Sequence, residues 1–343
     1  MRFVAILLLI CAVSCGIIDA PASELSGYSA VSVCDSEKSL SQYPDLAKTG
    51  ELSVVIPGLK EGWIPQGITW LEEQGWFLFA GYHSDNRASA LIAVNADNGA
   101  VVKSVRLRNV DGSPYTGHAG GVCATEHDIY VANNHRLYRL SIPVFLSLPP
   151  QADCAFEQEI PVPNNASYCS YTDGMLWVGE FQYGTSYMTD PSHKLKLDRD
   201  TLQAWLCGYK LNDGHLSDQA LSGETAIPDV IFETTERIQG MALFNSQIWL
   251  SQSYGRKNSS SLIRYADLRV NDPDMHVSVG GLEVPVWFLT DRRIEDKIIS
   301  PPMTECICTA GDSLYVLFES AAEKYMDPSN ASRSPMDRIV RIR

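Results

Sequence analysis

A two-strand unit recurs five times along this chain, and no other feature limits its possible folds as strongly. Each copy has a short apolar strand, a tight turn with Gly, Asp or Asn, and a second strand with an aromatic residue. Such periodic units are the sequence signature of repeat architectures. The copies are QGITWLEEQGWFLFAGYH from Gln66, GGVCATEHDIYVANNH from Gly120, SYCSYTDGMLWVGEFQ from Ser167, QGMALFNSQIWLSQSY from Gln239 and ECICTAGDSLYVLFES from Glu305.

Further strands follow the copies. The third strands read ALIAVN, RLYRLSI, AWLCGYK, SLIRYAD and DRIVRIR, and the weaker fourth strands read VVKSVRL, FEQEIPV, PDVIFE and EVPVWFL. Four-stranded antiparallel units in tandem are typical of propeller blades. We therefore predict an all-β fold, a single β-propeller of five blades. A six-bladed ring, with the extra blade in the long third or fourth copy, is the alternative.

The last blade lacks a fourth strand, because the chain ends on its third. The segment LSVVIPG from Leu52 precedes the first blade and can supply that strand. Pairing of this N-terminal strand with the last blade closes the ring and hides edges that would otherwise invite aggregation. The propeller then spans residues 51–343, and residues 23–50 form an N-terminal extension.

The first residues indicate export. Arg2 precedes an apolar run over residues 3–13, which is too short to span a membrane. The tripeptide APA before Ser23 suits a signal peptidase and gives a signal peptide of residues 1–22. Alternatively, AVSCG resembles a lipobox that would make Cys15 a lipid anchor. Either route predicts a secreted or cell-surface protein, extracellular or periplasmic.

Charge and motifs exclude several classes of function. Lys and Arg total 27 against 41 Asp and Glu, and no basic run could grip nucleic acid or an anionic membrane. The sequence has no hydrolase elbow, GxGxxG loop or P-loop, so we expect no nucleotide or flavin cofactor. Seven cysteines follow the leader without metal-site spacing, and their pairing is left open. We expect a monomer.

The repeat also predicts where polar residues gather. In a propeller the first strands start, and the second strands end, at the same rim of the central channel. The aligned first positions are Gln66, Gly120, Ser167, Gln239 and Glu305. Two residues before these positions, on the same side of an extended chain, stand His118 and Arg237. The second strands bring Glu180, Gln252, Tyr254 and Glu319 to that rim.

These residue types support several roles. Glu305 could act as a base or as a metal ligand, because a carboxylate on an innermost strand must be hydrated, paired or metal-bound. His118 could transfer a proton, and Arg237 could clamp an anion. Calcium could bind oxygen ligands from Glu305 and its neighbours. The expected substrate-binding residues are Gln66, Gln239, Glu180, Gln252, Tyr254 and Glu319.

Seven stretches carry a resemblance to a group of secreted β-propeller proteins of largely uncharacterised function. They are IPQGITW, TGHAGGVCAT, MLWVGEF, RIQGMAL, SQSYGR, PPMTECICT and LYVLFESAAEKY. The resemblance implies a propeller and export but no reaction. More distantly, the channel pattern is similar to calcium-dependent propeller lactonases and hydrolases. Those are usually six-bladed, and here Gln replaces an acid at some of the positions.

Two functions fit this sequence. The first is a hydrolase or lyase that acts on a small polar or carbohydrate-derived substrate. The second is a non-catalytic propeller that binds a glycan or a protein at its rim. The second function predicts a rim rich in aromatic residues such as Tyr82, Phe181 and Tyr254, without a tightly held metal.

Overall fold

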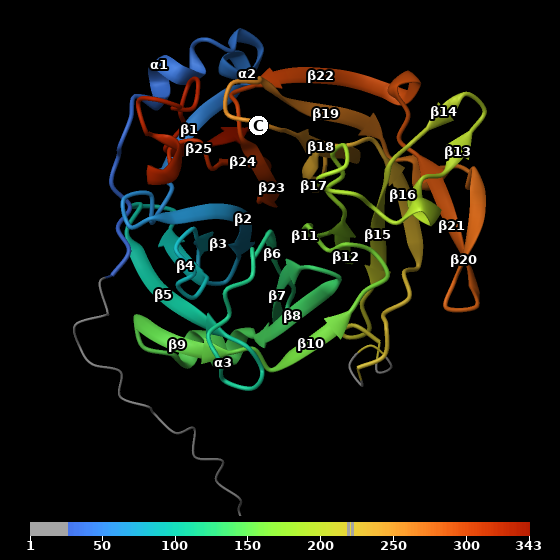
Figure 1. The fold of residues 1–343 in the computed structure, drawn as a ribbon, viewed down its shortest axis with the longest axis horizontal. Coiled ribbons are helices and arrows are strands. Elements are labelled where there is room, and N and C mark those ends of the chain that lie inside the picture. Colours follow the sequence, from blue (N-terminus) through green and yellow to red (C-terminus); the bar gives the residue numbers. More distant parts are fainter. Residues whose placement is uncertain (1–26, 218–219, 221–222) are drawn as a thin grey trace, which may run out of the picture.

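The computed structural model describes residues 27–217, 220 and 223–343. The expected signal peptide and Cys15 lie outside these residues. Five sheets surround a central axis as the blades of a β-propeller (Figure 1). This arrangement confirms the predicted all-β fold with five blades. In the described part of the chain, no helix has the length and apolar character needed to cross a membrane.

Each blade is an antiparallel sheet whose first strand faces the axis. Blade 1 contains β2 (Trp63–Leu71), β3 (Trp76–His83), β4 (Ala90–Asn95) and β5 (Val101–Arg108). Blade 2 contains β6 (Gly121–Ala124), β7 (Asp128–Asn133), β8 (Arg136–Ser141) and β10 (Gln158–Pro161). Blade 3 contains β11 (Tyr168–Thr172), β12 (Met175–Gly179), β15 (Ala204–Lys210) and β16 (Val230–Thr234). Blade 4 contains β17 (Ile238–Phe244), β18 (Gln247–Gln252), β19 (Ser260–Ala266) and β22 (Ile294–Ser300).

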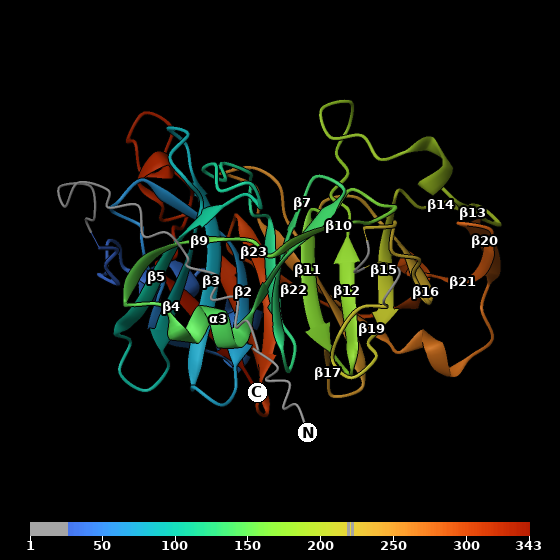
Figure 2. The same cartoon turned by 90° about the horizontal axis from the view of Figure 1, so that it is seen from below.

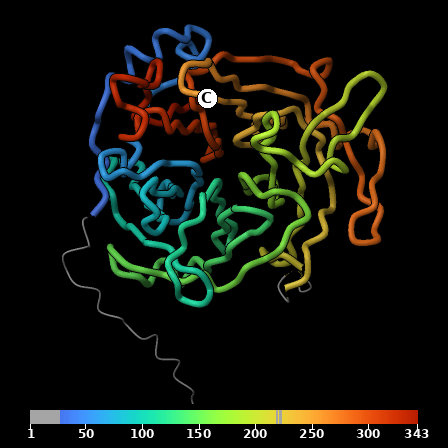
Figure 3. The backbone as a smooth tube through the Cα atoms, in the orientation of Figure 1, coloured from blue at the N-terminus to red at the C-terminus, as the bar shows by residue number. Residues whose placement is uncertain are grey.

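Blade 5 joins the two ends of the described chain. It contains β23 (Thr304–Ala310), β24 (Ser313–Phe318), β25 (Arg338–Ile342) and, as its outer strand, β1 (Gly50–Val55). Strand β1 pairs antiparallel with β25, with Leu52 opposite Val340. Figure 3 shows the blue N-terminal chain beside the red C-terminal chain in this blade. The predicted closure of the ring is confirmed.

Glycines let the innermost strands pack closely around the axis. A Cβ atom on Gly67 of β2 would lie 2.5 Å from the backbone nitrogen of Val122 in β6. A Cβ atom on Gly240 of β17 would lie 2.8 Å from the Cα of Cys306 in β23. Gly121 meets the backbone of Cys169 in the same way. Backbone cannot yield as a flexible side chain can, so these contacts require glycine.

One expected outer strand lies elsewhere. EVPVWFL was expected to be the fourth strand of blade 4, but that place belongs to β22. Instead, β21 (Leu282–Phe288) pairs in parallel with β16 and extends blade 3, together with β20 (Met275–Val279). The apolar pattern of β21 matches a buried strand, whereas β22 reads IEDKIIS and keeps charged side chains exposed to solvent.

Short elements decorate the ring. Helices α1 (Ser36–Leu40) and α2 (Pro44–Thr49) lie at its outer edge, beside β1 and β22 (Figure 1). Helix α3 (Ile142–Ser147) leads into β9 (Gln151–Ala155), which pairs in parallel with β5. An insertion between β12 and β15 carries β13 (Lys196–Leu197) and β14 (Asp200–Thr201), and Figure 2 shows it projecting above one face of the disc.

Candidate functional site

A cavity of about 540 Å³ opens where the innermost strands begin. Its walls come from all five blades and from the insertion that follows β12. Six of the site residues expected from the sequence line it, and four further residues complete the walls described here. The expected residues are Gln66, His118, Gln239, Tyr254, Glu305 and Glu319, and the others are Tyr82, Phe181, Lys324 and Tyr325.

Two carboxyl groups meet in this mouth. Glu305 lies on β23 and is 2% exposed, and its carboxyl group hydrogen-bonds with that of Glu319, just after β24. Gln66 Nε2 donates to Glu319 Oε2 over 2.8 Å. Gln239 Nε2 lies 3.3 Å from Glu305 Oε1 and donates to it. Strands from three blades therefore hold the pair in place.

The environment of the pair raises both pKa values. Burial, and then the negative charge of Glu319, raise the pKa of Glu305 well above its usual value. Burial also raises the pKa of Glu319, to about 7. Two neighbouring carboxyl groups of this kind share a proton, because both cannot ionise at close range. Near neutral pH, the pair therefore holds one proton between its two carboxyl groups.

One side of the mouth is cationic and aromatic. Lys324 Nζ lies 5.6 Å from the centre of the Tyr82 ring and 5.4 Å from that of Tyr325. The Tyr82 and His118 rings are 4.3 Å apart. Partial desolvation at the cavity wall, and then the Lys324 ammonium, lower the pKa of His118. His118 is therefore a neutral imidazole at neutral pH and can accept a hydrogen bond.

The opposite side is an aromatic wall. Phe181 and Tyr187 come from the insertion, and their rings meet edge to face at 5.3 Å. Tyr254, which follows β18, stacks on Tyr183 at 3.8 Å. Tyr187 remains 52% exposed. This wall offers flat apolar surface beside the polar groups of the mouth.

Three expected site residues do not line the cavity. Arg237 pairs with Glu236, Nε to Oε1 at 3.1 Å, and its φ of 65° lies in the left-handed region. The alternation expected of an extended chain therefore fails at Arg237. Gln252 Nε2 donates to the carbonyl oxygen of Glu236 over 3.0 Å instead of reaching the cavity.

Glu180 lies behind the wall and anchors the insertion. Its carboxylate accepts hydrogen bonds from the backbone nitrogens of Asn165 and Trp205, each at 2.9 Å. His193 Nδ1 lies 3.0 Å from Glu180 Oε1, and its ring stacks on Trp205 at 3.8 Å. Glu180 does not line the cavity, because its buried carboxylate faces these three partners instead.

Lys324 and Tyr325 are site residues that the strand pattern of the sequence did not predict. They belong to a single 3₁₀ turn, Glu323–Tyr325, in the loop after β24. The aligned repeat says nothing about such a loop, because its length differs between blades. The only signal was the stretch ESAAEKY, in which both residues stand.

Two carboxyl groups, those of Glu305 and Glu319, line the cavity at the expected calcium site. No group of three or more His, Cys, Asp or Glu within the described residues is placed to hold a metal ion. Calcium takes six to eight oxygen ligands. Glu319 and Glu305 have the amide side chains of Gln66 and Gln239 as partners. Calcium at Glu305 stays a prediction from the sequence.

Comparisons with known proteins give no family for this chain. No protein-family model matches the chain, and no curated protein matches it. Among solved structures, Myxococcus xanthus glutaminyl cyclase is similar at 11% identity and a TM-score of 0.42, over 86% of this chain and 95% of that chain.

Two other solved structures are similar. A Thermus thermophilus oxidoreductase, named as a glucose dehydrogenase, has 12% identity and a TM-score of 0.40, over 86% of this chain and 99% of that chain. A luciferin-regenerating enzyme has 10% identity and a TM-score of 0.39, over 85% and 92%. These likenesses agree with distant similarity to propeller proteins, and at such values they carry no argument about activity.

Proposed function

We propose that this protein is an exported hydrolase that cleaves an ester or lactone bond in a small, carbohydrate-derived substrate. The observation that carries the proposal is the hydrogen-bonded pair of carboxyl groups, Glu305 and Glu319, in the central mouth. Perturbed carboxyl pKa values in a cleft are a common property of acid–base sites. Two carboxyl groups in different protonation states can divide the acid and base roles.

The pair can perform hydrolysis with balanced proton transfers. The Glu319 carboxylate removes a proton from a water molecule, whose oxygen then bonds to the substrate carbonyl carbon. As the tetrahedral intermediate collapses, the bond to the leaving oxygen breaks and Glu305 donates its proton to that oxygen. Transfer of the new proton from Glu319 to Glu305 restores the pair. Gln66 and Gln239 hold the two carboxyl groups throughout.

The walls support a carbohydrate-derived substrate. Ligand sites combine apolar and aromatic lining with a few placed polar groups. Here Phe181 and Tyr254 present ring faces, while His118 and Lys324 present an acceptor and a cation on the other side. A sugar-like ring has apolar C–H faces and polar edges, which matches this division. Lys324 supplies the positive charge for binding an anionic group, a role that was expected of Arg237.

The test is turnover of lactones and sugar esters by the mature protein and by Glu319→Gln and Glu305→Gln. We expect each substitution to lower kcat by about 10²–10⁴-fold, because general acid–base groups contribute that much. Binding of the substrate, followed by thermal shift, should persist. Glu323→Gln, at an exposed neighbouring carboxylate, is the matched control and should keep wild-type kcat. Wild-type kcat in both dyad variants would refute the acid–base assignment.

The aromatic residues favour a second candidate, a glycan-binding propeller. Tyr82, Phe181 and Tyr254 all line the mouth, as that reading expected. It predicts saturable binding of oligosaccharides with no turnover, and affinity that falls in Tyr254→Ala but not in Glu305→Gln. A glycan array followed by calorimetry on the two variants separates it from the hydrolase. A calcium titration of melting temperature, with EDTA and with Glu305→Ala, tests the metal expectation in the same samples.

A further inference from the structure

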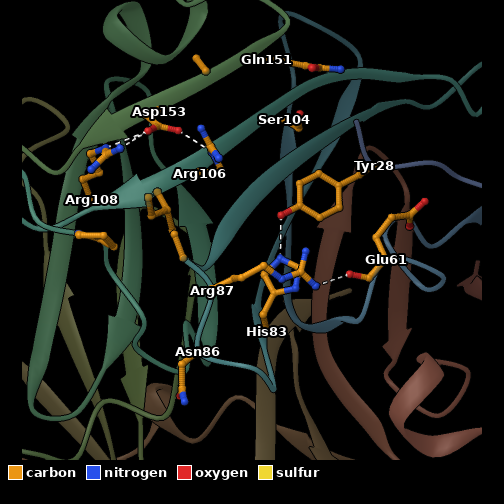
Figure 4. Close-up of a pocket in the computed structure, with 14 residues that line it drawn as sticks. Tyr28, Glu61, His83, Asn86, Arg87, Ser104, Arg106, Arg108, Gln151 and Asp153 are labelled. Atoms are coloured by element: carbon orange, nitrogen blue, oxygen red, sulfur yellow. Dashed lines mark hydrogen bonds and ion pairs between the residues drawn. The ribbon is translucent and has the colours of Figure 1, made fainter. Parts of the chain in front are cut away.

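A second cavity, of about 510 Å³, lies away from the channel at the outer edge of blade 1. It shares no lining residue with the central mouth. Its walls come from the N-terminal segment at Tyr28, the turn at Glu61, the loop after β3, and the parallel strands β5 and β9 (Figure 4). The function proposed for the mouth makes no use of this cavity.

Two arginines share one carboxylate in its wall. Arg106 Nε donates to Asp153 Oδ1 over 2.6 Å, and Arg108 Nε donates to Asp153 Oδ2 over 2.9 Å. Two guanidinium groups and one carboxylate leave a local surplus of one positive charge. Arg106 bonds to Asp153 through Nε alone, so its terminal nitrogens have no hydrogen-bond partner among the described residues, and its side chain is 28% exposed. Several donors therefore remain available to a ligand.

A third arginine approaches from the loop. Arg87 Nη2 donates to the carbonyl oxygen of Glu61 over 2.9 Å, and its Nε pairs with Asp85. In Figure 4 the Arg87 guanidinium lies beside His83, on the side of the cavity that also holds Tyr28. The Tyr28 hydroxyl and His83 Nε2 are hydrogen bonded at 2.8 Å, which fixes the tyrosine ring.

Besides Asp153, Glu61 is the other acidic residue that lines this cavity and could oppose an anion. Its Oε1 accepts a hydrogen bond from the Ser29 hydroxyl over 2.7 Å, which holds the carboxylate toward the N-terminal segment. Figure 4 shows that carboxylate on the other side of the Tyr28 ring from Arg106. The side of the cavity that Arg106 and Arg87 face is thus cationic.

The remaining wall sets the size and kind of ligand. Ser104, beside Arg106 on β5, is 7% exposed, and its hydroxyl has no hydrogen-bond partner in the described part of the chain. Leu107, Pro114 and Ala152 supply apolar surface. A guanidinium fork matches a planar carboxylate with two parallel hydrogen bonds. One surplus charge and an apolar wall suit a singly charged organic acid better than a phosphate.

We propose that this peripheral cavity binds a small organic carboxylate, held by the free edge of Arg106 with Arg87 and Ser104 beside it. The site is separate from the dyad, so it can hold its ligand whether or not the mouth is catalytic. Arg106 has two tasks in this arrangement: its Nε ties β5 to β9 through Asp153, and its terminal nitrogens receive the ligand.

The experiment is calorimetric titration of the mature protein with benzoate and, separately, with benzamide, at matched ionic strength. The two probes share a ring and differ in charge. We expect saturable binding of benzoate only, with affinity at least about tenfold weaker in Arg106→Gln and Arg87→Gln, since charge-assisted hydrogen bonds are the strong ones. Arg292→Gln removes a surface arginine that also pairs with a carboxylate, Asp200, and should bind benzoate as wild type does.

Further variants keep the outcome clear if Arg106→Gln is unstable. Arg106→Lys keeps a cation for Asp153 but loses the fork, and Arg87 is 53% exposed, so Arg87→Gln should fold normally. Glu305→Gln should leave benzoate binding unchanged, which separates this site from the mouth. Equal affinity for benzoate in wild type and both Arg87→Gln and Arg106→Lys overturns the proposal. So does tighter binding of inorganic phosphate, or no saturable binding of benzoate up to about 10 mM.

Discussion

The surroundings of a buried carboxyl group in this protein can either lower or raise its pKa. Asp337 is fully buried, and burial acts to raise its pKa, yet hydrogen bonds from Ser36 and Ser32 hold that pKa below the usual value. Glu305 has a second carboxyl group as its partner, and its pKa rises instead. The difference lies in the neighbours, because several donors face the Asp337 carboxylate, whereas a like charge faces that of Glu305. A buried carboxyl group can therefore serve as a charged structural anchor, as in Asp337, or as a protonated acid, as in Glu305.

Glu233 on β16 offers the cleanest test of this contrast. It is fully buried, and burial raises its pKa to about 9, although the Leu195 nitrogen donates to its Oε1 over 3.2 Å. The folded state therefore binds this proton more tightly than the unfolded chain. Stability from this group is complete below the unfolded pKa and is lost as the pH rises through the folded pKa.

We expect Glu233→Gln to flatten the pH dependence of stability. Urea unfolding at about pH 5 and about pH 9 should show wild type losing more free energy of unfolding than the variant, because glutamine does not ionise. Glu283→Gln on β21 is the control, since that side chain is exposed. A variant whose loss equals that of wild type would mean that Glu233 ionises freely in the folded protein.

At the residue scale, the repeat predicted the site where the backbone is regular. Glu305 stands at an aligned first position and Glu319 follows a second strand, so counting positions brought them to one rim. Arg237 was expected at the rim because side chains alternate along an extended chain. Its backbone is left-handed, so the alternation fails there. Lys324 and Tyr325 come from a loop whose conformation no periodicity describes. Counting positions therefore found mouth residues on or next to the inner strands and missed those in the longer loop after β24.

At the scale of elements, the inner hairpins carry the fold and the outer strands vary. The inner strands need glycine where backbones meet, and that requirement is visible in QGITW, GGVCA and QGMAL. Outer strands have one solvated face, so their sequences are less distinctive. β22 is polar enough to be overlooked, and the apolar β21 was placed in the wrong blade.

The close approach of inner strands can be measured with Gly121→Ala. Its new Cβ would press on the backbone of Cys169 in the next blade, so we expect a loss of about 1–3 kcal/mol in the free energy of unfolding. Gly27→Ala is the control, because its Cβ would meet only the flexible Gln151 side chain. Denaturant unfolding of both variants gives the comparison. Equal stability of Gly121→Ala and wild type would show that the inner strands can separate at little cost.

At the scale of the whole molecule, the ring depends on joining distant parts of the chain. The pairing of β1 with β25 covers an edge that would otherwise present a row of unpaired backbone groups. The Asp337 carboxylate strengthens this joint by accepting hydrogen bonds from the Val33 and Cys34 nitrogens, at 2.6 and 2.9 Å. The N-terminal segment is thus fastened to the last blade twice, once by a strand and once by a buried carboxylate.

A chain that begins at residue 57 removes both fastenings, whereas a chain that begins at Gly27 keeps them. We expect the shorter chain to melt at a lower temperature and to self-associate, because β25 becomes an open edge and blade 5 loses its outer strand. Melting followed by circular dichroism and size-exclusion chromatography of the two chains supply the measurements. Asp337→Asn in the longer chain separates the two fastenings, since it keeps β1 and weakens only the carboxylate joint. If the shorter chain elutes and melts like the longer one, blade 5 is stable with three strands, and closure by β1 is not what holds the ring together.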